Sequence, residues 1–128
     1  MVAGRVVVRD VLKILIVEDE PLVAALLADW VTSWGFEVIG PVASEAQAFE
    51  IIEREPLDGA ILDINLGGLD GWSIPFTLLE KDLPFVVVTS YNPSTLPQWL
   101  SVAPTLSKPV DEIELRAVLA SHLGRATS

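Results

Sequence analysis

The 128-residue sequence has no cysteine and a single histidine, His122. Without cysteine the chain can form no disulfide, offers no thiolate to a metal and has no cysteine nucleophile, which is typical of a reducing compartment. One histidine excludes a zinc site built from several histidines. We therefore expect a cytoplasmic protein whose chemistry rests on carboxylates, hydroxyls and amines.

Positive charge and long apolar runs are also scarce. Eight lysines and arginines stand against 18 aspartates and glutamates, so the formal net charge is −10. This charge repels a phosphate backbone, and we expect no nucleic-acid partner. Apolar runs such as Leu83–Val88 are far shorter than the roughly 18 residues of a membrane-spanning helix. The first ten residues lack the long apolar core of a secretory signal, so no membrane partner is expected either.

Hydrophobic residues make up 51% of the chain, enough for the core of one domain. We expect the domain at residues 11–124, with an N-terminal extension at 1–10 and a short tail at 125–128. Five apolar runs predict strands at Lys13–Val17, Phe36–Ile39, Gly59–Ile64, Phe85–Thr89 and Ala103–Leu106. Between them, helical spacing and capping residues predict helices at Pro21–Trp34, Ser44–Glu55, Ser73–Lys81 and Asp111–Leu123.

A fifth helix is expected between the last two strands, at Asn92–Val102, but Pro93 and Pro97 predict that it is short or irregular. Trp30 and Trp34 lie on the apolar stripe of the first helix, and we expect both in the core. The alternation of strands and about five helices indicates an α/β fold with a doubly wound parallel sheet. In such sheets the ligand site lies beyond the carboxyl ends of the strands.

Polar side chains follow several of these strands directly. The acidic run Glu18-Asp19-Glu20 comes after the first strand, Asp63 ends the third with Asn65 two residues later, and the fourth ends at Thr89. Lys108 follows the fifth. Each has an ordinary structural interpretation when taken alone: Asp19 would cap the first helix, and Lys108 would be a solvated surface charge. Together, they predict one polar rim.

The residue types in this rim suit phosphoryl chemistry. Carboxylates about 5 Å apart repel by about 3 kcal/mol at an effective dielectric constant of about 20. A divalent cation such as Mg²⁺ removes this repulsion and prefers oxygen ligands. A lysine and a hydroxyl can bind phosphoryl oxygens, so a carboxylate nucleophile beside them forms a phosphoryl-accepting site.

Four segments, ILIVEDEP, ILDINLGGLDG, FVVVTSYN and LSKPV, resemble in order and spacing the receiver domain of two-component response regulators. The resemblance extends over roughly residues 11–123. It implies a flavodoxin-like fold with strand order 2-1-3-4-5. It also implies that Asp63 accepts a phosphoryl group from a kinase phosphohistidine in a reaction that needs Mg²⁺ or Mn²⁺.

The resemblance assigns further roles to the residues of the rim. The metal would be held by Asp19 and Asp63 directly, by Glu18 through water and by the backbone carbonyl of Asn65. Thr89 and Lys108 would bind the phosphoryl group and serve as its switch residues. The bond between Lys108 and Pro109 would be a cis peptide.

The chain departs from the family pattern at three places. Gly67 replaces the proline usual four residues after the phosphoacceptor, Thr105 replaces the usual switch aromatic, and the fourth helical segment has two prolines. PFVVVTSYN and PTLSKPV are similar to the alphaproteobacterial single-domain regulators of the FAT GUY subgroup, although Val87, Val88 and Ser90 differ from its motif. Tyr91 would assist a switch in this loop or shield the entrance of the site.

The resemblance implies a stand-alone receiver rather than an enzyme acting on a separate substrate. Its partners would be a histidine kinase, a phosphotransfer protein and a downstream protein target, and it would serve as an output, an intermediate or a phosphate sink. Three alternatives remain: a pseudo-receiver binding module that signals without phosphorylation, a phosphatase of the haloacid-dehalogenase type and a flavin-binding module. The phosphatase would need an acid at position 65, and the acidic run after the first strand would repel the phosphate of a flavin.

Overall fold

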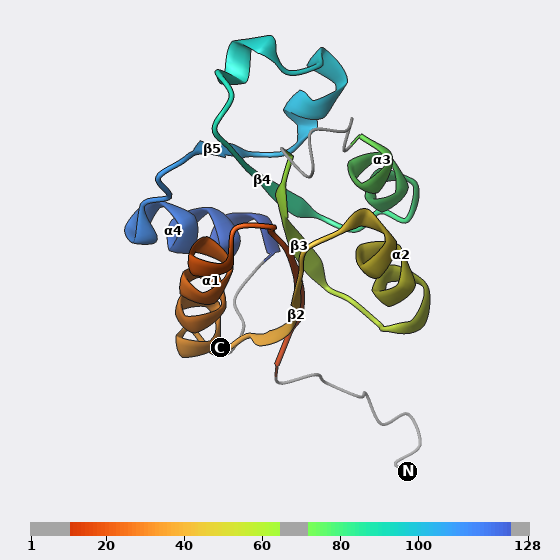
Figure 1. Cartoon of the computed structure of the whole chain (residues 1–128), viewed down its shortest axis with the longest axis vertical. Coiled ribbons are helices and arrows are strands. Elements are labelled where there is room, and N and C mark those ends of the chain that lie inside the picture. Colours follow the sequence, from red (N-terminus) through yellow and green to blue (C-terminus); the bar gives the residue numbers. More distant parts are fainter. Residues whose placement is uncertain (1–10, 65–71, 124–128) are drawn as a thin grey trace.

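The computed structural model describes residues 11–64 and 72–123. Its centre is a sheet of five parallel strands in the order β2-β1-β3-β4-β5 (Figure 1). The strands are β1 (Lys13–Val17), β2 (Glu37–Val42), β3 (Gly59–Asp63), β4 (Phe85–Thr89) and β5 (Thr105–Ser107). The predicted fold class and strand order are confirmed.

Four α-helices cover the two faces of the sheet. On one face lie α1 (Pro21–Ser33) and α4 (Glu112–Leu123), and on the other lie α2 (Glu45–Arg54) and α3 (Ser73–Glu80) (Figure 1). The predicted caps are present: the Ser44 hydroxyl accepts the Gln47 N–H at 3.2 Å, and the Asp111 carboxylate accepts the Glu114 N–H at 2.8 Å. These bonds satisfy N–H groups that a helix start leaves unpaired.

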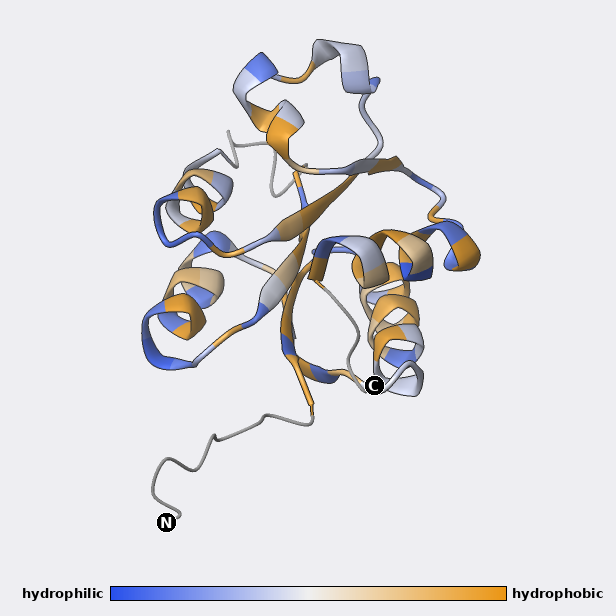
Figure 2. Ribbon diagram, turned by 180° about the vertical axis from the view of Figure 1, so that it is seen from behind, coloured by the Kyte–Doolittle hydropathy of each residue, from blue (hydrophilic) through white to orange (hydrophobic). Residues whose placement is uncertain are grey.

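Two apolar layers fill the space between the sheet and its helices. Leu15, Leu62 and Val87 face the layer under α2 and α3, whereas the alternate residues Ile16 and Ile61 face the layer under α1 and α4. The three central strands β1, β3 and β4 are therefore hydrophobic on both faces, as Figure 2 shows. This double burial explains why their sequences predicted the strands within one residue.

The segment between β4 and β5 forms no α-helix. It contains two short 3₁₀ helices, η2 (Pro93–Thr95) and η3 (Gln98–Val102). Pro93 and Pro97 precede or open these turns, and the Asn92 side chain accepts the Ser94 N–H at 3.0 Å. The predicted irregular helix is thus two separate turns.

Two predictions from hydrophobic spacing need correction. Trp30 and Trp34 are half-buried rather than in the core: they stack on each other with ring centroids 6.4 Å apart at the border of the layer under α1. The second strand was predicted to end at Ile39 but continues to Val42. It does so through a register shift and through Gly40, whose φ of +100° only glycine adopts readily.

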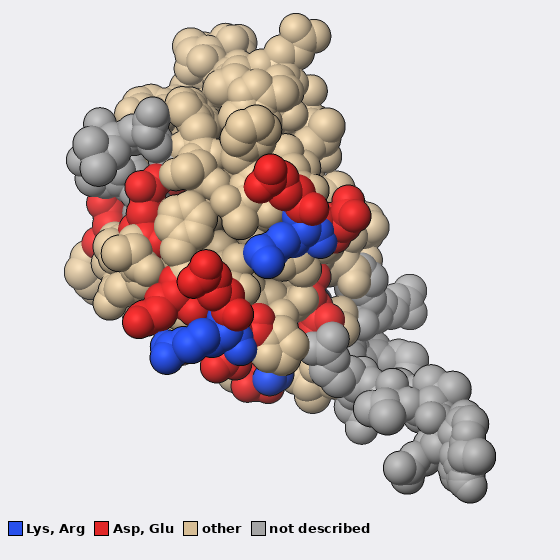
Figure 3. Space-filling model, turned by 90° about the vertical axis from the view of Figure 1, so that its right-hand side faces the viewer, with Lys and Arg blue, Asp and Glu red and all other residues tan. Residues whose placement is uncertain are grey.

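Charged side chains are unevenly distributed over the surface. Residues 83–107 contain no acidic or basic side chain. In Figure 3, which faces the α2–α3 side, the upper part of the molecule, where Figure 1 places η2 and η3, is free of both charge types. No helix within the described ranges has the length and apolarity to cross a membrane.

Gly40→Ala should lower the free energy of unfolding by about 2 kcal/mol, because a side chain at this φ is strained. An added Cβ would also lie 2.9 Å from the Val42 nitrogen and 3.1 Å from the Ile16 oxygen, both backbone atoms. Urea unfolding followed by circular dichroism measures the change. An unchanged midpoint would contradict this reading of β2.

Asp82→Gly is the matched control, in which the free energy of unfolding should rise instead of fall. Asp82 follows α3 with φ +57° and is the only non-glycine residue with positive φ in the described ranges. Glycine favours this conformation, so we expect a gain of about 0.5 kcal/mol in the same experiment.

Candidate functional site

Three polar or charged side chains are buried among residues 11–64 and 72–123: Glu18, Asp63 and Thr89. All three stand at the carboxyl ends of neighbouring strands, after β1 and at the ends of β3 and β4. The structure therefore brings together the polar residues that the sequence placed at this edge. Asn65, predicted to contribute a backbone carbonyl, lies outside the described residues.

Four carboxylates gather at this edge. Glu18, Asp19, Glu20 and Asp63 each offer an oxygen, and these oxygens lie within 4.8 Å of one another. Glu18 and Asp63 are buried, whereas Asp19 and Glu20 are exposed. The Glu18 N–H donates to the Val42 carbonyl at 2.9 Å, so the extended end of β2 helps to place the acidic run.

Asp19 does not serve as a helix cap. The N-cap residue of α1 is Glu20, and no side chain caps the helix there. The ordinary structural interpretation of Asp19 is therefore wrong, and its carboxylate stays with the acidic cluster. Pro21 occupies the first turn of α1, where its missing N–H has no effect on the helix.

The Lys108 ammonium is the positive charge within this cluster. It lies 3.0 Å and 3.1 Å from the two Glu18 oxygens, 2.8 Å from Glu20 Oε1 and 3.3 Å from Asp63 Oδ2. Its side chain is 10% exposed. The Lys108 N–H donates to the Thr89 carbonyl at 2.9 Å, and the bond to Pro109 is a cis peptide. The interpretation of Lys108 as a solvated surface charge is wrong.

Burial and the neighbouring charges shift two pKa values in this cluster. Burial and a hydrogen bond to Asp63 raise the pKa of the Glu18 carboxyl from 4.5 to about 7, against the opposing effects of the Glu20 N–H and of Lys108. Burial lowers the pKa of Lys108, but hydrogen bonds to Glu20 and Glu18 and the charge of Asp63 outweigh it, so this pKa lies above its ordinary value. The cluster has more negative charge than one lysine balances.

A divalent cation fits this surplus of negative charge. Burial is the main cause of the raised pKa of Glu18 and the neighbouring Asp63 adds to it, and a cation beside both carboxylates would stabilise their charged forms. The donors are all carboxylate oxygens, which suit Mg²⁺ and Mn²⁺. Glu18, Asp19 and Asp63 are thus well placed to hold such an ion.

Thr89 connects this polar edge to the uncharged segment. Its side chain is fully buried, and its hydroxyl oxygen accepts the Tyr91 N–H at 3.0 Å. The Tyr91 ring is half exposed. Thr105, at the start of β5, lines a hollow of about 430 Å³ together with residues between Pro93 and Ala103.

Sequence reasoning missed the part played by Glu20. The sequence predicted that Lys108 binds the phosphoryl group and assigned no partner to Glu20, yet the shortest contact of Lys108 is with Glu20. The feature of the sequence that could have indicated this role is that Glu20 continues the acidic run.

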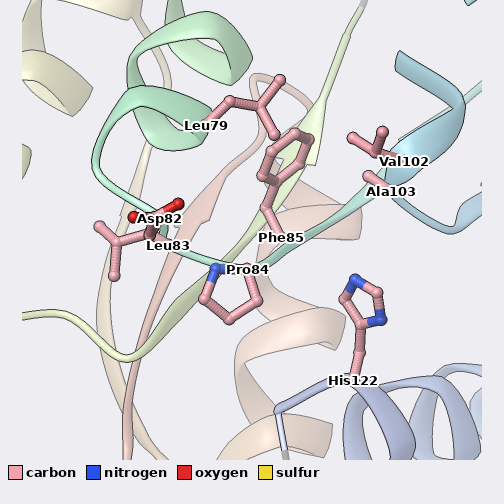
Figure 4. A pocket seen from close by; sticks show the side chains of 8 residues that line it. All are labelled: Leu79, Asp82, Leu83, Pro84, Phe85, Val102, Ala103 and His122. Atoms are coloured by element: carbon pink, nitrogen blue, oxygen red, sulfur yellow. The ribbon is translucent and has the colours of Figure 1, made fainter. Parts of the chain in front are cut away.

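His122 lies apart from the site, at the rim of an apolar hollow of about 420 Å³ near the start of β4 (Figure 4). Thr89 and Asp63 stand at the other ends of their strands, so His122 takes no part in this chemistry.

Comparison with protein families places residues 14–120 under the family described as response regulator receiver domain. Two curated relatives are the response regulator GtcR of Aneurinibacillus migulanus and the positive alginate biosynthesis regulatory protein of Pseudomonas aeruginosa. The first is 32% identical over 117 residues, which are 88% of this chain and 48% of the relative. The second is 34% identical over 113 residues, 84% of this chain and 46% of the relative. The chain thus spans about half the length of these relatives.

A solved structure of similar length also matches. The solution structure of SdrG from Sphingomonas melonis Fr1 superposes with a TM-score of 0.78 at 32% sequence identity. The match covers 89% of this chain and 98% of that one.

Asp19→Asn should weaken Mn²⁺ binding about tenfold, because it removes one charged oxygen ligand from the cluster. The signal of free Mn²⁺ in electron paramagnetic resonance measures the affinity. Asp29→Asn, which removes the same charge from an exposed position on α1, is the control and should bind as the wild type does. Equal affinity of Asp19→Asn and wild type would contradict the assignment of Asp19 to the metal site.

Proposed function

Because this chain belongs to the response regulator receiver domain family, we propose that it accepts a phosphoryl group on Asp63 from the phosphohistidine of a histidine kinase or a phosphotransfer protein. The observation that carries this proposal is the place of Asp63: a buried carboxylate that ends a central strand, 3.3 Å from a lysine and beside two other acids. A carboxylate so placed is a nucleophile with a neutralising partner already in position.

In the proposed transfer, a carboxylate oxygen of Asp63 attacks the phosphorus atom. The new bond is between that oxygen and phosphorus, and the bond between phosphorus and the donor's histidine nitrogen breaks, with its electron pair returning to the imidazole. The product is an aspartyl phosphate. Catalysis here is positioning and charge neutralisation, because the transition state spreads negative charge over the phosphoryl oxygens.

The residues around Asp63 take separate parts in this step. Glu18, Asp19 and Asp63, with the backbone carbonyl of Asn65, would hold Mg²⁺ or Mn²⁺, which supplies positive charge to the phosphoryl oxygens. The Lys108 ammonium binds a phosphoryl oxygen as a point charge. The Thr89 hydroxyl donates a hydrogen bond to a second phosphoryl oxygen. It thereby connects the phosphoryl group to the segment that follows β4.

We further propose that the chain signals by contact with another protein, as an output, an intermediate or a phosphate sink in a phosphorelay. The similarity to SdrG over nearly the whole of that chain supports a single-domain regulator, and the FVVVTSYN and LSKPV segments support the FAT GUY subgroup. The protein would act in the cytoplasm and would not catalyse a reaction on a separate substrate.

Asp63→Asn should abolish phosphorylation, because an amide oxygen is a far weaker nucleophile than a carboxylate. The protein is incubated with acetyl phosphate and Mg²⁺, and intact mass is recorded. Wild type and the control Asp29→Asn should each gain one phosphoryl group. Stoichiometric labelling of Asp63→Asn would refute the proposed acceptor.

Activation should act mainly on residues 90–102. When the Thr89 hydroxyl turns toward a phosphoryl oxygen, its bond to the Tyr91 N–H is strained, and Thr105 offers no ring to move in response. We therefore expect ordering of η2 and η3 rather than ring rotation. Amide hydrogen exchange with and without beryllofluoride measures this ordering, and Asp63→Asn, which lacks the acceptor carboxylate, is the control.

The largest change in exchange should fall within residues 90–102. Thr105→Tyr supplies the missing ring and should leave this change in place. A change confined to α1 and α2 would contradict the proposed route.

A further inference from the structure

Glu20 occupies a helix-capping position but does not cap the helix. Residues at an N-cap normally accept an N–H bond of the first turn with their side chain. The Glu20 side chain instead reaches Lys108, with Oε1 2.8 Å from Nζ, while its backbone N–H donates to Glu18 Oε2 at 3.1 Å. Its side chain is 57% exposed, so it stands at the solvent side of the cluster.

The Lys108 ammonium donates hydrogen bonds to Glu18 Oε2 and Glu20 Oε1, and it forms an ion pair with Asp63 Oδ2. It carries three N–H donors, and oxygens of three carboxylates lie within 3.3 Å of it. A phosphoryl oxygen that binds Lys108 therefore competes with these carboxylates for the ammonium. The carboxylates differ in how easily each gives up its contact with Lys108.

Asp63 is the side chain that carries the phosphoryl group, so the comparison is between Glu18 and Glu20, and release of Glu20 is the less unfavourable. The side chain of Glu18 is fully buried, and a buried carboxylate that loses its partner cannot be hydrated in exchange. The Glu20 carboxylate is already in contact with solvent, and water replaces the lost hydrogen bond. Glu20 is therefore the exchangeable partner of Lys108.

We infer that Glu20 is a positioning residue that holds Lys108 in the unphosphorylated protein and yields it when a phosphoryl group arrives on Asp63. This inference rests on the proposed function. Glu20 acts through Lys108 and does not touch the reacting atoms. Its negative charge both competes for the lysine and opposes an incoming phosphate.

Glu20 and Lys108 also lie beside a groove at the surface. Both line a groove of about 360 Å³ with apolar residues of α1 and of the turn before α4, among them Trp30 and Pro109. The acidic run also borders a second hollow of about 350 Å³, which lies at the end of β2. The contact between Glu20 and Lys108 thus lies between the buried carboxylates and open solvent.

Glu20→Gln tests the inference, because it keeps the shape of the side chain and removes its charge. We expect the rate of phosphorylation by acetyl phosphate, and the affinity for beryllofluoride, each to rise about threefold, the size typical of an exposed charge interaction. Asp29→Asn removes one charge elsewhere on α1 and should leave both unchanged. A role of Glu20 as a metal ligand predicts the opposite sign, a slower reaction with weaker Mn²⁺ binding, and that result would overturn the inference.

A second readout needs no phosphorylation. The chain has three lysines, Lys13, Lys81 and Lys108, so the ammonium resonances in ¹H–¹⁵N spectra are simple to assign. In the unphosphorylated protein, Glu20→Gln should shift the Lys108 resonance and speed its hydrogen exchange, and Asp29→Asn should do neither. An unchanged Lys108 signal, or a phosphorylation rate equal to that of wild type, would overturn the inference while leaving the proposed function intact. Absence of label on Asp63 in wild type would instead refute the proposed function, and this inference with it.

Discussion

The site depends on one largely buried ammonium group among carboxylates. Lys108 lies close to acids that follow β1 and β3, and without it two buried carboxylates would face each other with no positive charge. The parallel sheet makes this arrangement possible, since all strands end at the same edge and β1 and β3 are neighbours. The long side chain of Lys108 extends from β5 past the end of β4 to reach them. One lysine among four neighbouring carboxylates leaves negative charge in excess, and this excess makes the site suitable for a cation.

Much of this arrangement could be read from the sequence because the central strands are uniformly apolar. Strands buried on both faces leave a continuous signal, and the polar residue that ends such a strand must lie at the carboxyl edge. Asp63 and Thr89 were located in this way. The sequence of β2 has no such signal, since Gly40 and Pro41 are typical of a turn. Only the backbone geometry shows that the strand continues through them and that Val42 then binds the Glu18 N–H.

The sequence could not predict which carboxylate binds Lys108 most closely. Local patterns place residues on an edge or a face, but they do not determine the direction of a long, partly exposed side chain such as Glu20. The same limit explains Trp30 and Trp34. Their spacing places them on the apolar stripe of α1, yet two adjacent indole rings at the edge of the layer stack on each other and stay half exposed.

The site and the uncharged segment differ in how firmly they are held, and this difference bears on signalling. Asp63 ends β3, and the other acids and Lys108 directly follow β1 and β5, strands that are paired in the sheet. Residues 90–102 have only two short 3₁₀ turns and no charge of their own, so a new charge at Asp63 cannot act on them through ion pairs. Hydrogen bonds at the point where the two parts meet provide a route instead. Thr89 is that point: its carbonyl accepts the Lys108 N–H, and its hydroxyl accepts the Tyr91 N–H. A phosphoryl group that engages both Lys108 and the Thr89 hydroxyl would therefore act on both of these hydrogen bonds, one toward the acidic edge and one toward the segment beyond it.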